Sequence, residues 1–312
     1  MHHIALVPGD GVGPEVIGAA RRVLDAAAEL AWSDSLAETR VALKGPTSTA
    51  VAGERSFNIA LRREFDLHTS IRPVRFGGVD LVVARMNGED LYAGIEWEPG
   101  SVPADVPPDA GGSLKYISEG EARRSMRTAC RWAKQAGRER ATVVHKATVM
   151  RQTDGLFLRV AREEAEAAGL EVDDMLVDTA CGELARDHSR FDVLLAPVMY
   201  GDLLSDLAAG LAGGPGIAPN ANLGDDCAVF ETVHGSAPRR AGQGVANPFA
   251  AILAGAMLLR HLGEDAAALN VEGAVAACAE RGVVTYDLTA ERDPSAAAST
   301  DEVADAVIGF LE

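Results

Sequence analysis

The sequence predicts an α/β fold, in which short apolar strands alternate with longer amphipathic helices. Residues 3–8 form an apolar segment that ends at a glycine-rich turn, and an amphipathic pattern follows over residues 15–30. The same alternation recurs, with apolar strand patterns at residues 79–85, 141–147 and 191–198. A chain of 312 residues suits one large domain or two closely joined domains.

Helical patterns separate these predicted strands. The first helix is expected to begin near Pro14, because proline is tolerated in the first turn of a helix. Further helices are predicted over residues 120–137 and 155–169. Residues 247–263 are strongly apolar, which predicts a helix in the core or at a subunit interface. Residues 99–112 are rich in proline and glycine and predict an extended loop or arm rather than a domain boundary.

Composition excludes several classes of protein. The formal net charge of -17 argues against a nucleic-acid partner, because proteins bind phosphates by neutralising them with Lys and Arg. Four widely spaced cysteines without a CxxC motif predict free thiols rather than a zinc site or a disulfide framework. Neither a signal-peptide pattern nor a membrane-spanning apolar run is present, so we expect a cytoplasmic protein without a membrane partner.

Two acidic pairs have helical i and i+4 spacing. Asp202 and Asp206 follow directly after an apolar strand pattern, and Asp174 and Asp178 have the same spacing. An isolated pair of this kind is usually a solvated helix face. The position of Asp202 after a strand favours function, because α/β proteins bind ligands at the carboxyl ends of strands. Oxygen ligands of this kind suit Mg²⁺ or Mn²⁺.

Several basic and hydroxyl side chains fall in apolar surroundings. Arg62, Arg72 and Arg85 lie within or beside apolar segments, where a guanidinium can bind a carboxylate bidentately. Lys146 interrupts an apolar run, which fits either a base with a shifted pKa or a lysine whose charged end reaches solvent at a strand end. The apolar run alone favours the second interpretation of Lys146. Tyr92, taken alone, is interpreted as an ordinary packed tyrosine.

Two glycine-containing segments are candidates for cofactor binding. Residues 9–13 (GDGVG) lack the GxGxxG spacing, so they are a weak dinucleotide signal. Residues 234–242 (HGSAPRRAG) contain small residues that permit close backbone approach and two arginines that suit a phosphate.

Taken together, these motifs resemble the isocitrate and isopropylmalate dehydrogenase family of β-decarboxylating dehydrogenases. The motifs that carry the resemblance run in family order from residue 4 to about 290: LVPGDGVGPEV, RSFNIALRREFDLHTSIRPVR, ARMNGEDLYAGIEW, VHKATVMRQTDGLF, YGDLLSDLAAGLAGG and ETVHGSAPRRAGQGVANP. The resemblance implies two α/β domains with a shared central sheet arrangement, which is not a Rossmann fold. It implies a large, cofactor-binding domain of residues 1–67 plus 213–312. The small domain would be residues 68–212, with a dimer-forming arm at about 92–135.

The resemblance also implies roles for individual residues, in a homodimer with shared active sites. Arg62, Arg72 and Arg85 would bind the malate carboxylates. Asp202 and Asp206 would hold Mg²⁺ or Mn²⁺, with Asp178 contributed by the second subunit. Lys146, also from the second subunit, would be the general base, and Tyr92 would donate a proton to the enol. The residues implied in cofactor binding are Thr49, Asn87, His234, Gly235, Ser236, Ala237, Arg239, Arg240, Asn247 and Tyr286.

The implied reaction is oxidative decarboxylation of a 3-substituted malate, with isocitrate favoured. Isopropylmalate enzymes have apolar residues at the positions of Ser56 and Asn58. These two polar side chains therefore favour a substrate with a polar substituent at C3. Thr148, Val198 and a short stretch between residues 75 and 79 depart from the isocitrate-type pattern. A specialised paralogue acting on phosphonomethylmalate, homoisocitrate or isopropylmalate is therefore the alternative.

For the cofactor, the resemblance favours NADP⁺ over NAD⁺. NAD⁺-using relatives commonly have Asp where this chain has Arg239, and Tyr286 matches a tyrosine that NADP⁺-type relatives place near the 2′-phosphate. Ala290 stands where those relatives have an arginine, so one expected contact is missing. Two other classes are less favoured. A regulatory subunit would not need Lys146 and Tyr92, and a phosphate-loop protein would need a lysine that residues 9–13 lack.

Overall fold

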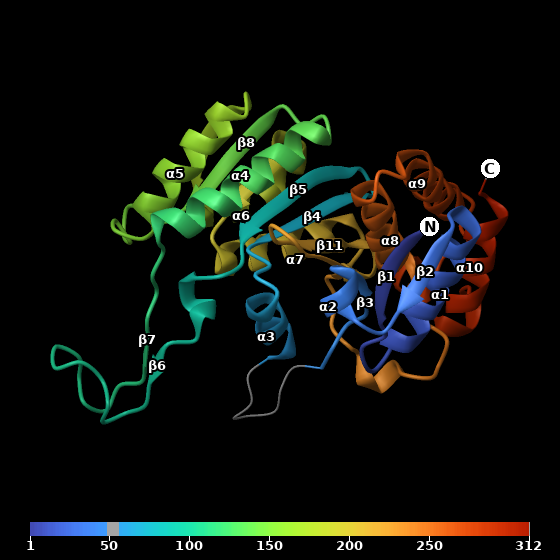
Figure 1. The fold of residues 1–312 in the computed structure, drawn as a ribbon, viewed down its shortest axis with the longest axis horizontal. Helices are drawn as coiled ribbons and strands as arrows, with labels where there is room; N and C mark the ends of the chain where they lie inside the picture. Colours follow the sequence, from blue (N-terminus) through green and yellow to red (C-terminus); the bar gives the residue numbers. More distant parts are fainter. Residues whose placement is uncertain (49–55, 312) are drawn as a thin grey trace. The chain divides into compact units, whose positions relative to one another are not determined.

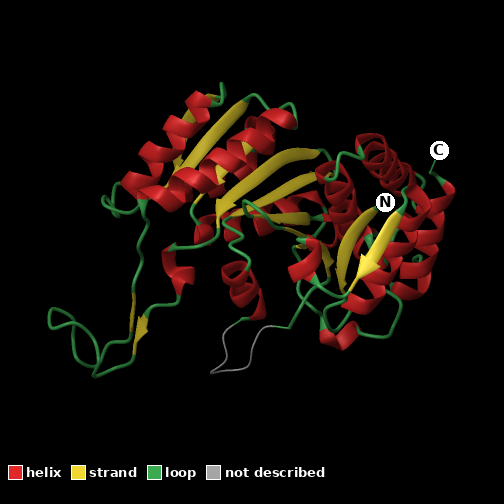
Figure 2. Ribbon diagram, viewed as in Figure 1, coloured by secondary structure: helices red, strands yellow, loops and turns green. Residues whose placement is uncertain are grey.

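The structure, a computed structural model, describes residues 1–48 and 56–311. The chain divides into two compact units. Unit 1 consists of Met1–Leu67, Ile71–Asp80 and Asp206–Glu312, and unit 2 consists of His68–Ser70 and Leu81–Ser205. Figure 1 follows the chain through both units and labels their elements, and Figure 2 separates helices from strands. The predicted α/β fold is confirmed, since strands and helices alternate along most of the chain.

The sheet of unit 1 is mixed. Its strands run in the order β2-β1-β3-β12-β11-β4. Strand β1 pairs in parallel with β2 and β3, and β12 pairs in parallel with β3 but antiparallel with β11. The bounds are β1 His2–Val7, β2 Leu30–Ser33, β3 Val41–Lys44, β4 Thr69–Phe76, β11 Pro219–Leu223 and β12 Ala228–Thr232.

The helices of unit 1 are built around α8 (Phe249–His261), which packs against α1, α9, β11 and β12. Ten of its thirteen residues are buried, so the apolar segment 247–263 is a core helix of this unit. Helix α1 also packs against α10, and Pro14 lies in the first turn of α1 as predicted. The remaining bounds are α1 Gly13–Ala27, α2 Leu36–Thr39, α3 Phe57–Glu64, α9 Asp265–Glu280 and α10 Thr300–Gly309.

The glycine-rich turn after β1 is explained by backbone packing. Gly9 and Gly11 have φ values of +74° and +60°, which glycine adopts without steric cost. A Cβ atom on Gly9 would lie 2.1 Å from the carbonyl oxygen of Pro46, and one on Gly11 would lie 2.0 Å from the carbonyl oxygen of Ser236. These glycines therefore let three backbone segments of unit 1 meet, which agrees with the weakness of the dinucleotide signal.

Unit 2 contains four parallel strands in the order β5-β10-β8-β9. Their bounds are β5 Val79–Met86, β8 Arg140–His145, β9 Glu171–Leu176 and β10 Val193–Ala196. Every residue of β10 and all but the first of β8 are buried, as expected for parallel strands covered by helices. Because the strands are parallel, the residues that follow them meet at one edge of the sheet.

Helices α4 (Glu119–Gln135) and α5 (Asp154–Ala167) pack against each other, and α5 also packs on β8 and β9 (Figure 1). The other helices are α6 (Val177–Arg186) and α7 (Val198–Ala212), which begins in unit 2. Strands β6 (Glu96–Trp97) and β7 (Gly112–Ser113) form a small antiparallel ribbon in an extended segment of unit 2, so the proline- and glycine-rich residues form the expected arm.

Two local expectations were wrong. Residues 191–198 are not all strand, because β10 ends at Ala196 and Val198 begins α7. Asp174 and Asp178 do not share a helix, because Asp174 lies on β9 and Asp178 lies in the first turn of α6. The i and i+4 spacing alone did not distinguish a helix from a strand followed by a helix. Within the described part of the chain, no helix is both long enough and apolar enough to span a membrane.

Candidate active site

Four of the predicted residues lie at the carboxyl edge of the unit 2 sheet. Arg85 lies near the end of β5, and Lys146 directly follows β8. Asp178 and Asp202 lie in the helices α6 and α7 that follow β9 and β10. The strand register explains this arrangement, because Ala196 at the end of β10 pairs with Arg85. Parallel pairing therefore brings residues from distant parts of the sequence to one edge.

One cluster at this edge joins a carboxylate to a cation and a phenol. Nη1 of Arg85 lies 2.5 Å from Oδ1 of Asp202, and the hydroxyl of Tyr92 donates to Oδ2 of the same carboxylate at 2.6 Å. Tyr92 lies in a 3₁₀ turn (Asp90–Ala93) that follows β5. Arg85 is buried, whereas the Asp202 side chain is 33% exposed. The cluster therefore presents a partly accessible carboxylate backed by a buried positive charge.

Gly201 explains how α7 comes so close to β5. A Cβ atom at Gly201 would lie 2.5 Å from the Cβ of Arg85, a separation that side chains do not tolerate. The glycine in YGDLLSD therefore serves the approach of the helix to the arginine, and its φ is not in the left-handed region. Asp206 lies one turn further along α7, so two of the three predicted metal ligands, Asp202 and Asp206, belong to this helix.

A second pair at this edge joins Lys146 to Asp178. Nζ of Lys146 lies 2.5 Å from Oδ1 of Asp178, and this contact is the main reason why the pKa of Asp178 lies below its usual value. The Lys146 side chain is 27% exposed and that of Asp178 is 64% exposed. Lys146 is thus neither within β8 nor fully buried. It lies at a strand end with its ammonium group on an acidic partner.

His145, which directly precedes Lys146, forms a hydrogen-bonded pair with Asp174. Nε2 of His145 lies 2.9 Å from Oδ2 of Asp174, and Arg162 contacts the other oxygen of this carboxylate. Burial lowers the pKa of His145, which favours its neutral form. Asp174 therefore holds β8 and α5 rather than serving as a second metal pair with Asp178.

Unit 1 contains the other predicted substrate residues. Ser56 is the N-cap residue of α3 but makes no side-chain cap, and Oδ1 of Asn58 accepts a hydrogen bond from Oγ1 of Thr47 at 3.2 Å. Arg62 lies on the same helix, and Arg72 lies on β4, where it is 5% exposed. The sequence predicted Thr49 as a cofactor contact, and that residue lies outside the described residues.

A buried charge network holds Arg62, and sequence reasoning missed its other four members. Nζ of Lys44 lies 2.8 Å from Oε2 of Glu231, and Nη2 of Arg62 lies 3.6 Å from Oε1. Asn220 and Asn222 donate to Oε1 at 3.0 and 2.7 Å. Burial acts to raise the pKa of Glu231, but Lys44 and Arg62 outweigh it and lower that pKa to about 2. The sequence signal that could have identified this network is a charged residue within a strand, Lys44 in β3 and Glu231 in β12.

The segment His234–Gly242 forms a loop after β12. Ser236 is buried, and its hydroxyl lies 3.1 Å from that of Ser48, which in turn donates to Asp10. Burial lowers the pKa of His234, whose Nε2 is buried and makes no hydrogen bond to any described residue. Gly235 is exposed and Ala237 has a φ of +40°. The small side chains of this loop leave its backbone open to close approach by a ligand, and the buried ring nitrogen of His234 lies in the same loop.

Two arginines follow in the same loop. Arg239 is exposed, and the guanidinium of Arg240 lies 4.3 Å from the centre of the Tyr286 ring. Sequence reasoning missed Glu15, whose carboxylate accepts from the backbone N–H groups of Gly242 and Gly244. Glu15 lies in the first turn of α1, so it ties the loop to that helix.

The last two predicted cofactor residues are buried. Asn247 donates to Oδ2 of Asp287 at 3.0 Å, and its Oδ1 accepts from the backbone N–H of Phe249. Asn87 belongs to unit 2, where its backbone N–H donates to the carbonyl of His68 at 2.9 Å. The predicted cofactor residues are therefore divided between the two units.

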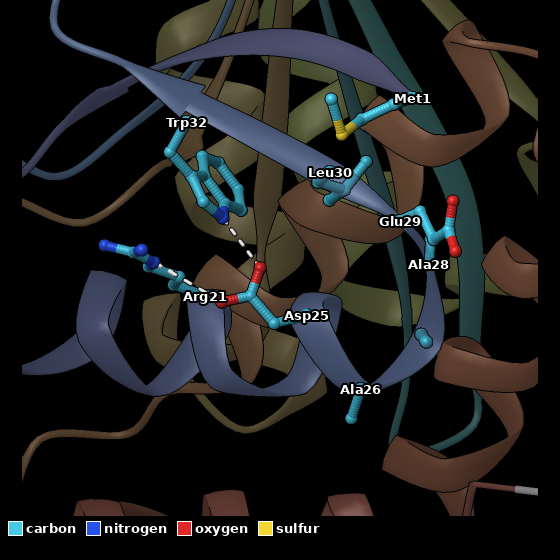
Figure 3. Close-up of a pocket in the computed structure, with 9 residues that line it drawn as sticks. Met1, Arg21, Asp25, Ala26, Ala28, Glu29, Leu30 and Trp32 are labelled. Carbon is cyan, nitrogen blue, oxygen red and sulfur yellow. Dashed lines mark hydrogen bonds and ion pairs between the residues drawn. The ribbon is translucent and has the colours of Figure 1, made fainter.

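A surface pocket of unit 1 contains none of the predicted residues. Met1, Arg21, Asp25, Leu30 and Trp32 are among the residues that line it (Figure 3). The indole N–H of Trp32 donates to Asp25 at 2.7 Å, and Arg21 contacts both side chains. The pocket is widely open to solvent, and its polar groups already contact one another. Nothing in its chemistry connects it with the clusters described above.

A family model described as isocitrate/isopropylmalate dehydrogenase matches residues 31–307. The chain belongs to the isocitrate/isopropylmalate dehydrogenase family. It is therefore a decarboxylating dehydrogenase by family, and the resemblance inferred from its motifs is confirmed.

Curated relatives and solved structures agree with this membership. The chain is 38% identical to the alpha subunit of mitochondrial NAD isocitrate dehydrogenase from Homo sapiens, over 91% of this chain and 85% of the relative. It is 37% identical to a regulatory subunit of the mitochondrial NAD isocitrate dehydrogenase from Dictyostelium discoideum, over 87% and 82%. The crystal structure of isocitrate dehydrogenase from Methylococcus capsulatus superposes with a TM-score of 0.91 at 38% identity, over 100% and 99%.

Proposed function

We propose that this enzyme oxidises a 3-substituted malate of the isocitrate type and removes its β-carboxylate as CO₂. The observation that carries the proposal is the pair of clusters at one edge of the unit 2 sheet. Asp202 there binds Arg85 and Tyr92, and Lys146 binds Asp178. A base, an acid, a carboxylate-binding cation and oxygen ligands are the groups that this reaction needs.

The substrate's carboxylates would be bound by Arg62, Arg72 and Arg85. A guanidinium binds a carboxylate with two parallel hydrogen bonds, which fixes orientation as well as charge. Ser56 and Asn58, in and before α3, would receive the substituent at C3. Two hydrogen-bonding side chains there favour a polar substituent, because an alkyl group would leave them without partners.

Two proton transfers are assigned to residues of this chain. Lys146, once its ammonium group has given up a proton, would take the proton of the 2-hydroxyl group as the hydride leaves C2 for the nicotinamide ring. The C–C bond to the β-carboxylate then breaks, CO₂ leaves, and the electron pair remains on the enolate. Tyr92 gives its phenolic proton to C3, which yields the 2-oxo acid. The contact of Tyr92 with Asp202 supports this role, because it orients the phenol toward the cluster.

A divalent cation fits the chemistry of the donor set. Asp202 and Asp206 on α7 offer carboxylate oxygens, which Mg²⁺ and Mn²⁺ prefer, and Asp178 of a second copy would complete the set. Among the described residues, no group of three or more His, Cys, Asp and Glu side chains is arranged to hold a metal ion within one chain. Such a cation supplies charge that stabilises the oxygen anions of the reaction. A homodimer with shared active sites is therefore part of the proposal.

For the cofactor we propose NADP⁺ over NAD⁺, held by unit 1 through residues 234–242, Asn247 and Tyr286. His234 Nε2, buried and without a hydrogen bond to any described residue, supports a polar ligand at this loop. Arg239 and Arg240 bring two positive charges to the loop, and a phosphate would bind them strongly. The human relative is named for NAD, so this preference would be a departure from that relative.

A regulatory role is the second candidate, since one relative is named a regulatory subunit. The contacts of Lys146 and Tyr92 with carboxylates favour catalysis, because a regulatory subunit has no need of them. The test is the appearance of reduced nicotinamide with isocitrate, homoisocitrate, isopropylmalate, tartrate and phosphonomethylmalate, each with Mg²⁺ and either cofactor. Turnover is expected with isocitrate or another polar C3 substituent. Inactivity with all five would overturn the proposal.

A further inference from the structure

Lys115 lies at the centre of a buried ionic network in unit 2 that the functions above do not use. Its Nζ lies 2.7 Å from Oδ1 of Asp154 and 3.4 Å from Oδ1 of Asp90. The Lys115 side chain is 12% exposed, and both carboxylates are fully buried. The same ammonium group lies 4.7 Å from the centre of the Tyr200 ring. One lysine thus forms ion pairs with two buried carboxylates and contacts the first turn of α7.

Each of the two carboxylates holds a turn that carries a proposed proton-transfer residue. Oδ2 of Asp154 accepts a hydrogen bond from the backbone N–H of Lys146 at 2.7 Å. Asp90 is the first residue of the 3₁₀ turn that contains Tyr92, and its Oδ1 accepts from the backbone N–H of Leu91 at 2.8 Å. Asp90 itself has a φ of +63°, a conformation that a non-glycine residue keeps only when its surroundings hold it.

Lys115 is a cation that contacts both of these buried carboxylates. Two buried carboxylates repel each other and are costly to bury unless a cation and hydrogen bonds compensate them. Tyr200 also hydrogen-bonds Asp154, and burial together with this carboxylate raises the pKa of the phenol, so Tyr200 stays a neutral donor. Lys115 supplies the positive charge that both carboxylates share.

We propose that Lys115 is a positioning residue, which fixes the turn of Lys146 through Asp154 and the turn of Tyr92 through Asp90. It would act through these two carboxylates rather than by contact with substrate or cofactor. The inference rests on the proposed function, because that proposal assigns the two proton transfers. It does not depend on whether a given active site takes Lys146 and Tyr92 from the same chain or from two chains.

The test compares Lys115→Met, Lys115→Arg and the control Arg138→Met in the intact enzyme. Arg138 also forms a buried ion pair in unit 2, with Asp192 at 2.9 Å, but that pair lies at the amino ends of β8 and β10. The measurements are kcat and KM with isocitrate, cofactor and Mg²⁺, the thermal midpoint, and hydrogen exchange of the Lys146 and Leu91 amides.

For Lys115→Met we expect kcat to fall about a hundredfold, because displacing a reacting group by about 1 Å costs that much. KM should change little, since the substrate-binding arginines are untouched. Hydrogen exchange should accelerate at the Lys146 and Leu91 amides together. Lys115→Arg should restore part of kcat and part of the protection of these amides. Arg138→Met should lower the thermal midpoint while leaving kcat and both amides near wild type. Wild-type kcat and protection in Lys115→Met would overturn the inference.

A second variant covers the case in which Lys115→Met does not fold. Lys115→Met combined with Asp154→Asn removes a buried charge along with its partner, so folding should recover. Low kcat in this folded double variant supports the inference, and wild-type kcat refutes it. Failure of the proposed function is seen separately, as wild-type enzyme that reduces no cofactor. In that event the exchange of the two amides still decides whether Lys115 holds both turns.

Discussion

The phenolic hydroxyl of Tyr92 donates a 2.6 Å hydrogen bond to Oδ2 of Asp202, while Arg85 holds the other oxygen of that carboxylate. A single carboxylate thus orients the proposed proton donor and balances a buried cation. Because these contacts join β5, the 3₁₀ turn and α7, loss of any one partner is expected to affect the other two.

Substitution of Tyr92 by Phe removes the proposed proton donor and keeps the ring. We expect kcat to fall by roughly 10²- to 10⁴-fold, the usual contribution of general acid catalysis, with little change in KM for the substrate. The measurement is steady-state turnover, with Tyr116→Phe as the control, since Tyr116 is an exposed tyrosine of the same unit. Equal turnover in the two variants would show that Tyr92 is no proton donor.

Asp202→Asn tests the proposed cation site. We expect metal-dependent turnover to be lost, because a neutral amide binds Mg²⁺ more weakly than a carboxylate does. The variant should also be less stable than wild type, since Arg85 is buried and would lose its counter-ion. The matched control is Asp226→Asn, which alters an exposed carboxylate in the turn between β11 and β12. Full turnover of wild-type enzyme after exhaustive chelation would refute a metal requirement.

Glu231 is expected to make unfolding dependent on pH. Its pKa in the folded enzyme is about 2, below the usual 4.5, so the carboxylate contributes stability above pH 4.5 and loses it as the pH falls toward 2. Glu231→Gln should cost about 3 kcal/mol at pH 7, because Lys44 stays buried without its partner. Urea unfolding at pH 7 and pH 3 measures both values. The cost should shrink at pH 3, and a cost independent of pH would contradict the assignment.

Arg239→Asp tests the proposed preference for NADP⁺. Wild type should have a higher kcat/KM with NADP⁺, and the substitution should move the ratio toward NAD⁺ by about tenfold or more, since a charge-assisted contact is replaced by repulsion. Arg281→Asp is a suitable control, because Arg281 lies at the end of α9 against Phe310. A wild-type enzyme that prefers NAD⁺ would contradict the proposed preference for NADP⁺.

Much of the α/β fold could be predicted because the apolar segments are short, separated and regular. The strands β1, β5 and β8 and the helices α1, α4, α5 and α8 all lie where periodicity placed them. The errors came from local ambiguity. The i and i+4 spacing of Asp174 and Asp178 is typical of one helix face, yet Asp174 lies on β9 and Asp178 on α6, because such a spacing carries no information on where β9 ends.

The candidate site was only partly predictable for a physical reason. Arg85 and Asp202 could be singled out because Arg85 lies near the end of an apolar strand and Asp202 follows one, whereas Lys146 and Tyr92 gained their roles only from the family resemblance. Two members of buried ion pairs were missed, namely Glu231, which contacts Arg62, and Lys115, which contacts Asp90 and Asp154. A buried ion pair joins residues far apart in the sequence, so neither member has a local pattern that identifies its partner. Only the folded chain brings them together.

The most direct test of oxidative decarboxylation with Lys146 as base is the ratio of CO₂ released to cofactor reduced. Isocitrate labelled in the β-carboxylate is supplied with Mg²⁺ and NADP⁺ or NAD⁺, to wild type, Lys146→Met and the control Lys134→Met on exposed α4 surface. Wild type and Lys134→Met should release one labelled CO₂ for each reduced nicotinamide, and Lys146→Met should form neither product at a comparable rate. Reduced cofactor without CO₂, or normal rates in Lys146→Met, would contradict the mechanism.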